Sequence, residues 1–429
     1  MPSIARYWGS KPGPLISDVI SEYVPLDGVV LDPFGGSGSI ILEVLRQKRK
    51  GIYVDVNPYA FVIAYSSLSK VVGPKLIQIA SRITSEVKEH LGDLYVLPCP
   101  LHGVQKVYMY EWIGKQCTAK LTCGCNVKSS DIQIPRSFSY PDGDLKYPDG
   151  RRFWKKRNVD SVGQLFTKRN LAILTMLHSI LLRNVENLSP NLSIPLITAF
   201  AAILFRSSKM ARRRAGGWGV NSYWVPHFHV ELNPLMLFKR AVRRLARKEG
   251  GFKVSLIHGA LDSCDAVMFL RSALSLDEAL KDYEVDAIVT DPPFTDEIQY
   301  YELSYMINIW IKDLLKEALK GVLSRIVIRF YRSEVVVNPI RGHTIETYIR
   351  RLYKAIKQAN ARLKRGGHFV LLFHEEDAHL HMEVKKIMER LDLVRVDEKE
   401  KLMKQRNIGC RDSRRGKLLK VYVYRKIKP

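Results

Sequence analysis

Gly28-Val-Val-Leu-Asp-Pro-Phe-Gly-Gly-Ser-Gly38 is the stretch that decides the fold of this chain of 429 residues. Its apolar run predicts a short buried strand that ends at Asp32. The glycines that follow predict a turn whose backbone can approach a ligand closely. A helical pattern over residues 39–48 and a second strand, Gly51-Ile-Tyr-Val-Asp-Val56, complete a unit typical of nucleotide-binding folds. Asp55, near the end of that second strand, is placed to accept hydrogen bonds from a ribose diol.

The spacing of the glycines argues against two common ligands of such turns. Phe34-x-Gly-x-Gly38 differs from the Gly-x-Gly-x-x-Gly fingerprint of dinucleotide-binding domains. The turn also lacks the Gly-Lys-Ser or Gly-Lys-Thr of a phosphate-binding loop. NAD and ATP are therefore both disfavoured.

A second motif lies far along the chain, at Ala287-Ile-Val-Thr-Asp-Pro-Pro-Phe294. It predicts a buried strand that opens into a loop stiffened by Pro292 and Pro293. The side chain of Asp291 and the carbonyl of Pro292 can accept hydrogen bonds from an amine. The ring of Phe294 can stack on a planar heterocycle. Tyr300 and Tyr301 follow closely and are candidates for packing near such a heterocycle.

Further apolar runs predict a seven-stranded, mostly parallel sheet that ends in an antiparallel hairpin, because no helix separates the last two strands. The five later strands are expected at residues 252–259, 285–290, 367–374, 393–401 and 418–425. The alternation of strands and helices breaks between residues 73 and 250. We therefore expect an α/β core formed by residues 1–72 and 251–429, with a large mixed insert at 73–250.

The composition indicates a polyanionic partner. The chain carries 68 Lys and Arg against 43 Asp and Glu, a formal net charge of +25, and nucleic acid is the usual partner of such an excess. The most apolar segment, residues 192–205, contains Pro195 and fits a buried helix better than a membrane span. The first residues lack a signal-peptide pattern, so a cytoplasmic protein without a membrane partner is expected.

Cysteines cluster at the start of the insert, in a zinc knuckle predicted over residues 95–130. Cys99-Pro-Leu-His102 and Cys123-Gly-Cys125 can together supply four S and N ligands, the tetrahedral set that Zn²⁺ prefers. Cys117 is an alternative to Cys123 or Cys125, because Cys-x-Cys is tighter than the usual spacing. Such a zinc ion would be structural and would stabilise a segment with little hydrophobic core.

The second part of the insert, residues 158–250, is helical and basic. Cations, glycines and an aromatic residue alternate in one stretch, which predicts phosphate contacts and base stacking by Lys209, Arg212, Arg213, Arg214 and Trp218. The helix that follows extends the basic face with Lys239, Arg240, Arg243, Arg244 and Arg247.

Asp32-Pro-Phe-Gly-Gly-Ser-Gly38 and Asp291-Pro-Pro-Phe294 together resemble the motifs of class I S-adenosylmethionine-dependent amino-methyltransferases. The chain is most similar to prokaryotic adenine-specific DNA methylases with a zinc-ribbon-like insert. Those share stretches like Leu165-Phe-Thr-Lys-Arg-Asn170, Asp291–Ser304 and Phe373-His-Glu-Glu-Asp377. The resemblance implies a Rossmann-like fold, S-adenosylmethionine as cofactor, and methyl transfer to N6 of adenine in DNA.

The resemblance also implies roles for single residues. Phe34, Gly36 and Gly38 would line the cofactor, Asp32 would lie near its methionine amino group, and Asp55 would bind its ribose hydroxyls. Lys11 would contact the methionine carboxylate. Asp262 would contact the adenine amine, with Asp265 as a competitor and a helix N-cap as the alternative role. In the family the first metal knuckle is Cys-x-x-Cys, whereas here His102 replaces the second thiol.

The catalytic group implied by the resemblance is Asp291, Pro292, Pro293 and Phe294, acting on a base flipped out of the duplex. Cytosine N4 is the nearest alternative target, although that subfamily more often has Ser in place of Asp291. Guanine N2 in tRNA or rRNA is a second alternative, although such enzymes usually carry an N-terminal RNA-binding domain. A nucleic-acid-binding protein without catalysis is the least favoured alternative, because the motif residues are intact.

Overall fold

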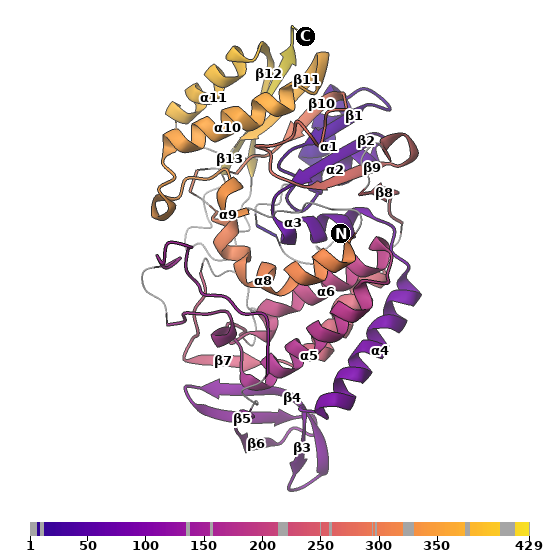
Figure 1. Cartoon of the computed structure of the whole chain (residues 1–429), viewed down its shortest axis with the longest axis vertical. Helices are drawn as coiled ribbons and strands as arrows, with labels where there is room; N and C mark the ends of the chain where they lie inside the picture. Colours follow the sequence, from indigo (N-terminus) through magenta and orange to yellow (C-terminus); the bar gives the residue numbers. More distant parts are fainter. Residues whose placement is uncertain are drawn as a thin grey trace. The chain divides into compact units, whose positions relative to one another are not determined.

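The computed structural model describes most of the chain. The described residues are 7–8, 13–133, 138–154, 158–212, 222–248, 250–256, 260–293, 295–296, 298–320, 330–373, 378–403 and 417–428. The chain forms two compact units (Figure 1). We call residues 7–70, 250–301 and 321–429 the sheet unit, and residues 1–6, 71–249 and 302–320 the insert unit.

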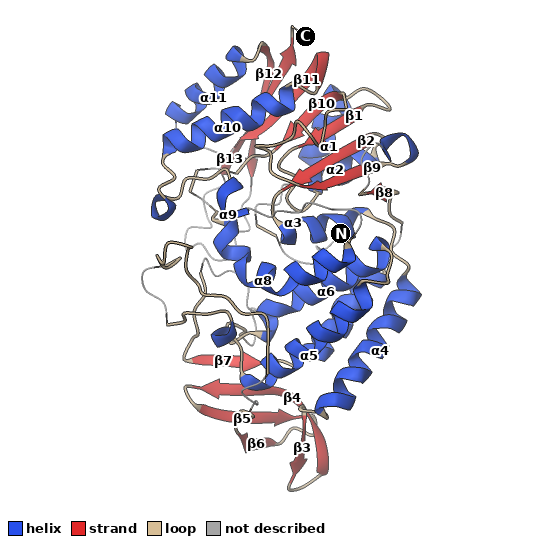
Figure 2. Ribbon diagram, viewed as in Figure 1, coloured by secondary structure: helices blue, strands red, loops and turns tan. Residues whose placement is uncertain are grey.

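The sheet unit contains an eight-stranded sheet in the order β12-β13-β11-β10-β1-β2-β9-β8 (Figure 2). Its strands are β1 (Val29–Asp32), β2 (Lys50–Asp55), β8 (Val254–Ser255), β9 (Ala266–Leu270), β10 (Val285–Thr290), β11 (Leu363–Phe373), β12 (Leu393–Met403) and β13 (Lys417–Lys426). The neighbouring strands β11, β10, β1, β2, β9 and β8 are parallel to one another, and β13 pairs antiparallel with both β11 and β12. The predicted sheet, mostly parallel with an antiparallel terminal hairpin, is confirmed.

The third strand differs from the prediction. Within the predicted strand 252–259, β8 holds only two residues and lies at the edge of the sheet. The strand beside β2 is β9, whose five residues are all buried. A strand covered on both faces has to be apolar throughout, and Ala266-Val-Met-Phe-Leu270 meets that requirement better than the mixed run before it.

Helices cover both faces of this sheet. On one face α1 (Gly13–Tyr23) and α2 (Ser39–Arg46) pack their apolar sides against β1, β10 and β11. On the other face α10 (Ile345–Asn360) and α11 (Ala378–Arg390) contact β11 and β12 and share a buried cluster with residues of the central strands. The unit also holds α3 (Pro58–Leu68), α9 (Phe330–Ser333) and the short 3₁₀ helices η2 (Ala260–Ser263) and η3 (Pro339–Arg341). This three-layer arrangement explains why the central strands read as continuous apolar runs.

The insert unit combines an antiparallel ribbon with a group of helices. The ribbon consists of β3 (Val96–Cys99), β4 (Gly103–Ile113), β5 (Gln116–Leu121), β6 (Asn126–Ser129) and β7 (Phe228–Glu231), and β7 pairs with β4. The helices are α4 (Gly73–Leu91), η1 (Gly163–Leu165), α5 (Lys168–Val185), α6 (Pro190–Ser207), α7 (Pro234–Ala246) and most of α8 (Tyr300–Ala318). Figure 1 shows α4 and α5 next to this ribbon.

Two helices of the insert unit bear on the sequence predictions. Helix α6 is long and apolar enough to cross a membrane, but 78% of its 18-residue window is buried, as in the core helix of a globular unit. In α8, Trp310 packs edge-on against the rings of Phe166, His178 and Phe200. Residues 302–320 therefore belong with the insert, and the predicted boundary at residue 250 misses this helix.

A buried ion pair joins the ribbon to the helices and explains the stretch Leu165–Asn170. The guanidinium of Arg169 donates to Glu231 Oε1 at 2.9 Å and lies 3.8 Å from the ring centre of Tyr110. Glu231 Oε2 accepts a hydrogen bond from Trp112 Nε1 at 2.8 Å. Asn170 donates to the carbonyls of Ser207 and Leu232. This stretch therefore holds β4 and β7 against α5.

Candidate functional site

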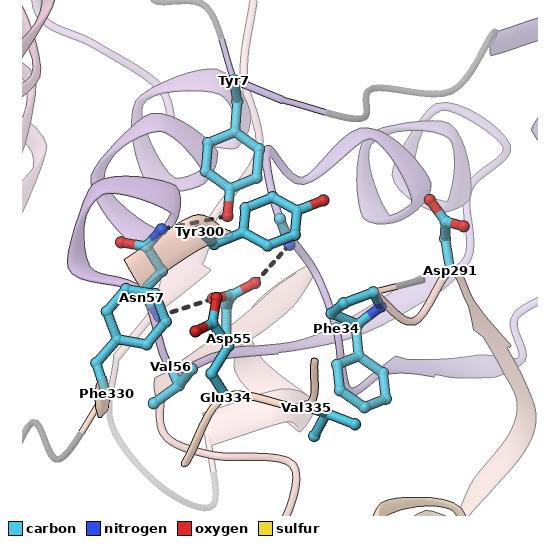
Figure 3. Close-up of a pocket in the computed structure, with 12 residues that line it drawn as sticks. Tyr7, Phe34, Asp55, Val56, Asn57, Asp291, Tyr300, Phe330, Glu334 and Val335 are labelled. Carbon is cyan, nitrogen blue, oxygen red and sulfur yellow. Dashed lines mark hydrogen bonds between the residues drawn. The ribbon is translucent and has the colours of Figure 1, made fainter. Parts of the chain in front are cut away.

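Three carboxylates lie at the carboxyl ends of central strands of the sheet. Asp32 ends β1, Asp55 ends β2 and Asp291 follows β10, and these three strands are adjacent and parallel. The chain changes direction across the sheet between β1 and β10, which is where open α/β sheets bind ligands. A pocket opens at this edge (Figure 3), lined by Tyr7, Phe34, Gly36, Asp55, Val56, Asn57, Asp291, Pro293, Tyr300, Phe330, Glu334 and Val335.

The glycine-rich turn beneath the pocket has a backbone that only glycine suits. Gly36 has a φ of 50°, and its N–H donates to Asp55 Oδ2 at 2.8 Å. A Cβ at Gly35 would lie 2.3 Å from the ring of Tyr53, closer than any side chain can come. Gly38 takes a φ of 80° and begins α2. The turn therefore brings bare backbone to the pocket.

Asp32 is a buried acid with one unused oxygen. Its side chain is 1% exposed, and Oδ1 accepts hydrogen bonds from Thr290 Oγ1 at 2.8 Å and from the Phe34 N–H at 3.2 Å. Within the described part of the chain, Oδ2 is buried and has no partner. Burial, together with the charges of Asp291 and Asp55, raises the pKa of Asp32 to about 8. A cation placed at Oδ2 would restore the ionised form.

Asp55 is oriented by the backbone around it. Its Oδ2 accepts from the Gly36 N–H at 2.8 Å, and its Oδ1 accepts from the Asn57 N–H at 2.7 Å. Burial raises the pKa of Asp55 to about 6, while these backbone hydrogen bonds act in the opposite direction. Each carboxylate oxygen has a second lone pair, so the side chain can still accept hydrogen bonds from two neighbouring hydroxyls.

Aromatic and apolar side chains form the walls of the pocket. The ring of Tyr7 stacks on that of Tyr300, with the centroids 5.6 Å apart and the planes 22° apart, as Figure 3 shows. The Tyr7 hydroxyl accepts a hydrogen bond from Asn57 Nδ2 at 3.3 Å. Burial raises the pKa of Tyr7, so this phenol stays neutral. Our sequence reasoning missed Tyr7, although the pair Tyr7-Trp8 just upstream of the glycine turn was a usable signal.

The loop that carries Asp291 is held from two sides. On one side, the Tyr348 hydroxyl on α10 donates to the Pro293 carbonyl at 3.0 Å. On the other, the Val337 N–H donates to the Thr295 carbonyl at 2.7 Å, and Gln299 Nε2 donates to the Val337 carbonyl at 2.9 Å. These contacts fix the loop that follows β10. Tyr348 gave no signal in the sequence, because it reads as an ordinary buried position of an amphipathic helix.

The pocket brings together most of the predicted residues of this edge. Phe34, Gly36, Asp55, Asp291 and Pro293 line it, and Pro292 belongs to the same loop. Asp32 and Gly38 lie directly below, at the end of β1 and the start of α2. Tyr300 lines the pocket as well, whereas Tyr301 packs against the rings of Phe330 and Tyr331. Lys11 and Phe294 lie outside the described residues.

The prediction for Asp262 is wrong, because this acid lies at the opposite edge of the sheet. It belongs to η2, which precedes β9, and the neighbouring Leu261 carbonyl accepts from Lys50 Nζ at the start of β2. Asp265, the competitor, also precedes β9, and its carboxylate accepts from the Lys253 N–H. The error follows from the misassigned third strand, since the carboxyl end of β9 is at Leu270.

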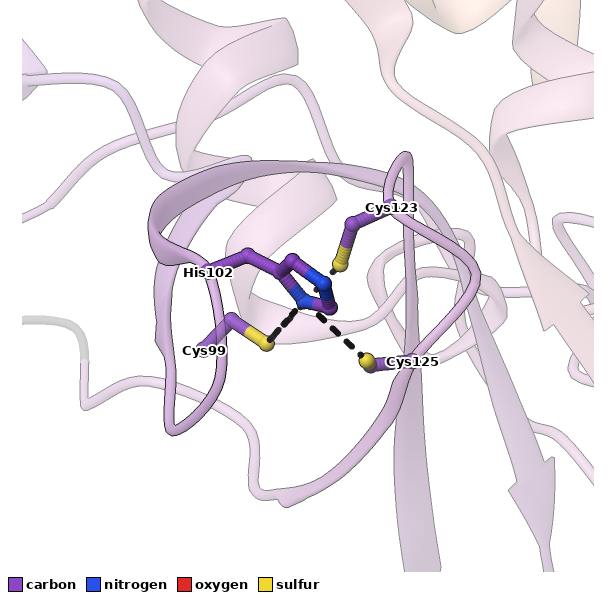
Figure 4. A group of neighbouring side chains, drawn as sticks. All are labelled: Cys99, His102, Cys123 and Cys125. Atoms are coloured by element: carbon purple, nitrogen blue, oxygen red, sulfur yellow. Dashed lines mark hydrogen bonds between the residues drawn. The ribbon is translucent and has the colours of Figure 1, made fainter.

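A separate Cys/His cluster lies in the ribbon of the insert unit (Figure 4). The ligand atoms of Cys99, His102, Cys123 and Cys125 all lie within 4.8 Å of one another. His102 Nδ1 is 3.5 Å from the sulfur atoms of both Cys99 and Cys125. Three thiols and one imidazole match the donor set of a structural zinc site. Cys117 is not part of the cluster: it is buried on β5 and pairs across the ribbon with Trp112.

The predicted nucleic-acid contacts are only partly described. Arg213, Arg214 and Trp218 lie outside the described residues. Arg212 is exposed, with its guanidinium 5.5 Å from the ring centre of Trp224. Lys209 is half-buried, and its Nζ donates to the Gln164 carbonyl at 3.2 Å. Lys209 therefore has an internal partner, which argues against the predicted phosphate contact.

Comparison with known proteins adds a family match to this geometry. Residues 4–66, which include the glycine-rich turn and Asp55, match the family described as DNA methylase. No curated protein matches the chain. The solved structures that align with it include an rRNA methyltransferase from Streptomyces viridochromogenes, at 10% identity over 99% of this chain and 90% of that chain, with a TM-score of 0.30. They also include a SAM-dependent methyltransferase from Methanosarcina mazei, at 13% identity over 45% of this chain and 77% of that chain, with a TM-score of 0.21. These TM-scores are too low to support an argument. The strand order, the glycine-rich turn and the family match over residues 4–66 together support a class I methyltransferase.

Proposed function

We propose that the protein transfers a methyl group from S-adenosylmethionine to the exocyclic amine of a base in nucleic acid, with N6 of adenine in DNA as the leading target. The observation that carries this proposal is the row of three acids on adjacent strands, one of which has an unused buried oxygen. Asp32 and Asp55 suit a cationic nucleoside. Asp291 suits a neutral amine.

The side of the pocket next to β1 and β2 fits S-adenosylmethionine by its chemistry. Asp32 Oδ2 would accept from the methionine ammonium group, which satisfies the oxygen and restores the charge of the acid. Asp55 would accept from the ribose hydroxyls. Val56, Phe330 and Val335 supply apolar walls for the adenine ring. When bound, the cofactor supplies a methyl group on a positively charged sulfur.

The Asp291 loop would hold the target amine. An aromatic amine is a poor nucleophile, because its lone pair is delocalised into the ring. If its two N–H groups donate to the Asp291 carboxylate and the Pro292 carbonyl, the nitrogen becomes more tetrahedral and its lone pair is free to attack. The same acceptors stabilise the positive charge that develops on the nitrogen. A base within a duplex would have to be flipped out to reach them, and Phe294 would then stack on it.

DNA is favoured over RNA because the matching family is described as DNA methylase. That family covers both N6 and N4 amines, so cytosine N4 is the nearest rival. Guanine N2 in tRNA or rRNA is the rival among RNA targets. In each case the Cys/His cluster would hold a structural zinc ion that takes no part in the reaction, because its four protein ligands leave no open coordination position.

An Asp291→Ala variant tests the proposal. It should bind S-adenosylmethionine with unchanged affinity in calorimetry but transfer tritiated methyl about 100-fold or more slowly, as expected for the loss of a group that acts in the transition state. Asp296→Ala is the matched control, because Asp296 is an exposed acid in the same loop. Retained turnover in the Asp291 variant would refute the role of this acid.

Nucleoside analysis of labelled DNA and RNA then identifies the target. Label in N6-methyladenine supports the leading proposal, whereas label in N4-methylcytosine or N2-methylguanosine replaces it with the corresponding rival. A wild-type protein with no measurable affinity for S-adenosylmethionine would contradict all of these enzymatic functions.

A further inference from the structure

The insert unit carries a cationic surface on α7 that the proposed active site does not use. This helix contains one lysine, three arginines and no acid over its 13 residues. Its apolar side is buried, whereas Arg240 and Arg244 are exposed one turn apart on the same side of the helix. Like charges at this spacing repel each other, so the helix gains no stability from them. A function outside the helix is therefore the better explanation for this pair.

The tertiary structure adds a third arginine from another helix. Arg206, in the last turn of α6, is exposed, and α6 packs beside α7. Partial burial lowers the pKa of Arg206, and the charges of Arg240 and Arg244 lower it further. In the described part of the chain, none of the three forms an ion pair with an acid. The surface is therefore short of negative charge.

An exposed aromatic ring borders this group. Tyr108, on β4, is 55% exposed, whereas Val107 before it and Tyr110 two residues later are buried. Tyr110, two residues along β4, pairs with Glu231 just before α7, and the phenol of Tyr108 acts electrostatically on Arg206. An exposed ring beside clustered arginines suits a polymer that offers both phosphate groups and the faces of flat rings. A membrane surface would use the charges but offers no flat ring on which Tyr108 could stack.

We propose that Arg206, Arg240, Arg244 and Tyr108 form a nucleic-acid-binding surface, on which the arginines contact successive phosphates and Tyr108 stacks on an unpaired base. We call it the α6–α7 surface. This proposal rests on the proposed function for the kind of polymer it binds. It differs from the basic stretch around Arg212, because it combines residues from α6, α7 and the ribbon that lie far apart in the sequence.

Salt-dependent binding tests the surface. Fluorescence anisotropy with a labelled single strand and its duplex, in a series of salt concentrations, would compare the wild type with an R240Q/R244Q variant. Each phosphate contact contributes about 0.7 (single strand) to 0.9 (duplex) to the magnitude of the slope of log K against log salt. The variant, which lacks two contacts, should therefore lose about 1.4–1.8 units of slope and roughly tenfold or more in affinity. An unchanged slope would overturn the proposal.

The chain offers a matched control for the loss of charge. Lys312 and Lys316 on α8 are also an exposed pair one turn apart in the insert unit. A K312Q/K316Q variant removes the same two charges and should keep most of the affinity and slope. If it loses as much as R240Q/R244Q, the effect comes from net charge and the α6–α7 surface is refuted.

Tyr108→Leu separates stacking from charge. The variant should bind the single strand about tenfold more weakly with an unchanged salt slope, and should bind the duplex like the wild type, because stacking on Tyr108 needs an unpaired base. An unchanged affinity for the single strand would overturn the role of Tyr108. Circular dichroism and calorimetry with S-adenosylmethionine would verify that every variant is folded.

The test of the α6–α7 surface can fail independently of the test of methyl transfer. A wild type that methylates nucleic acid while R240Q/R244Q binds like the wild type contradicts the surface alone. If R240Q/R244Q loses salt-dependent binding but the wild type never transfers a methyl group, only the catalytic proposal is contradicted.

Discussion

At the scale of single residues, Asp32 shows how burial prepares an acid for a cation. The side chain is 1% exposed, one oxygen is satisfied by Thr290 and the Phe34 N–H, and the other is not satisfied by any described residue. In the absence of a cation this environment favours the protonated acid, which raises the pKa of Asp32 to about 8. A ligand that brings a positive charge reverses the preference.

Affinity for S-adenosylmethionine should therefore depend on pH. Below pH 8 the free protein holds Asp32 mostly protonated, and the ammonium group of the ligand binds the ionised form, so the affinity should fall as the pH falls. The limit is about tenfold per pH unit, with about one proton released on binding at pH 7. Calorimetry in two buffers of different ionisation enthalpy measures that proton.

Asp32→Asn is the comparison for this experiment. It should bind more weakly and show a flatter pH profile between pH 7 and 8, leaving the weaker dependence from Asp55, whose pKa is about 6. A wild-type affinity that is independent of pH between 6 and 9 would contradict the role of Asp32.

Tyr348 acts on the site through the loop that it holds. Tyr348→Phe removes the hydroxyl that donates to the Pro293 carbonyl and leaves the buried ring in place. One hydrogen bond contributes about 0.5–1.5 kcal/mol, so we expect kcat to fall about two- to tenfold with unchanged affinity for S-adenosylmethionine.

Tyr353→Phe on the same helix is the control, because the structure gives its hydroxyl no hydrogen-bond partner among the described residues. Steady-state kinetics on both variants decides the matter. An equal loss in the two, or a loss of cofactor affinity in Tyr348→Phe, would argue against a positioning role.

At the scale of elements, the ribbon of the insert unit depends on two local centres. The Cys/His cluster joins the β3–β4 turn to the β5–β6 turn, and the buried pair Arg169–Glu231 joins the ribbon to α5. The described ribbon strands alternate buried and exposed residues, so only one face of the ribbon packs on the protein. A ribbon that packs through only one face buries little apolar surface, so it needs such links to be stable.

Metal removal should therefore unfold the ribbon. We expect about one zinc ion per chain by elemental analysis, and a clear fall in Tm after chelation or in a Cys125→Ser variant, since metal binding adds its free energy to folding. Cys264→Ser is the matched control, because Cys264 is a buried free thiol of the sheet unit.

Co²⁺ substitution provides an independent readout. The absorption bands of tetrahedral, thiolate-bound Co²⁺ should appear in the wild type and in Cys264→Ser, and should be lost in Cys125→Ser. A protein that is purified without metal, binds no Co²⁺ and keeps its Tm after chelation would contradict the metal site.

At the scale of the whole molecule, the insert unit is assembled from separate parts of the chain. Helix α8 follows the Asp291 loop in sequence, yet residues 302–320, which include most of this helix, belong to the insert unit. Trp310 is fully buried there against Phe166, His178 and Phe200. The insert is therefore not a simple excursion between residues 73 and 250.

Excision should reveal this arrangement. A protein in which a short linker replaces residues 71–249 should aggregate and bind a hydrophobic dye, because the apolar side of α8 loses its packing partners. Removal of residues 302–320 as well should give a soluble sheet unit that binds S-adenosylmethionine. Size-exclusion chromatography and dye fluorescence compare the two proteins, and equal solubility would contradict the assignment of α8 to the insert unit.

By itself, the sequence determined the class of fold and one half of the site. The glycine-rich turn, Asp32, Asp55 and the Asp291 loop could be predicted because each depends on a few neighbouring residues: strand burial, positive φ in glycine and the stiffness of proline. The same local logic identified Cys99, His102, Cys123 and Cys125. These signals depend little on the rest of the chain.

Only the tertiary structure decided which distant segments meet. It selected β9 over the run at residues 252–259 as the third strand, and so moved Asp262 to the opposite edge of the sheet. It also brought the Tyr348 hydroxyl to Pro293, and Arg206 to the arginines of α7. Such contacts depend on packing between elements that are far apart in the chain, where several apolar runs compete for one place, and no local pattern distinguishes the one that wins.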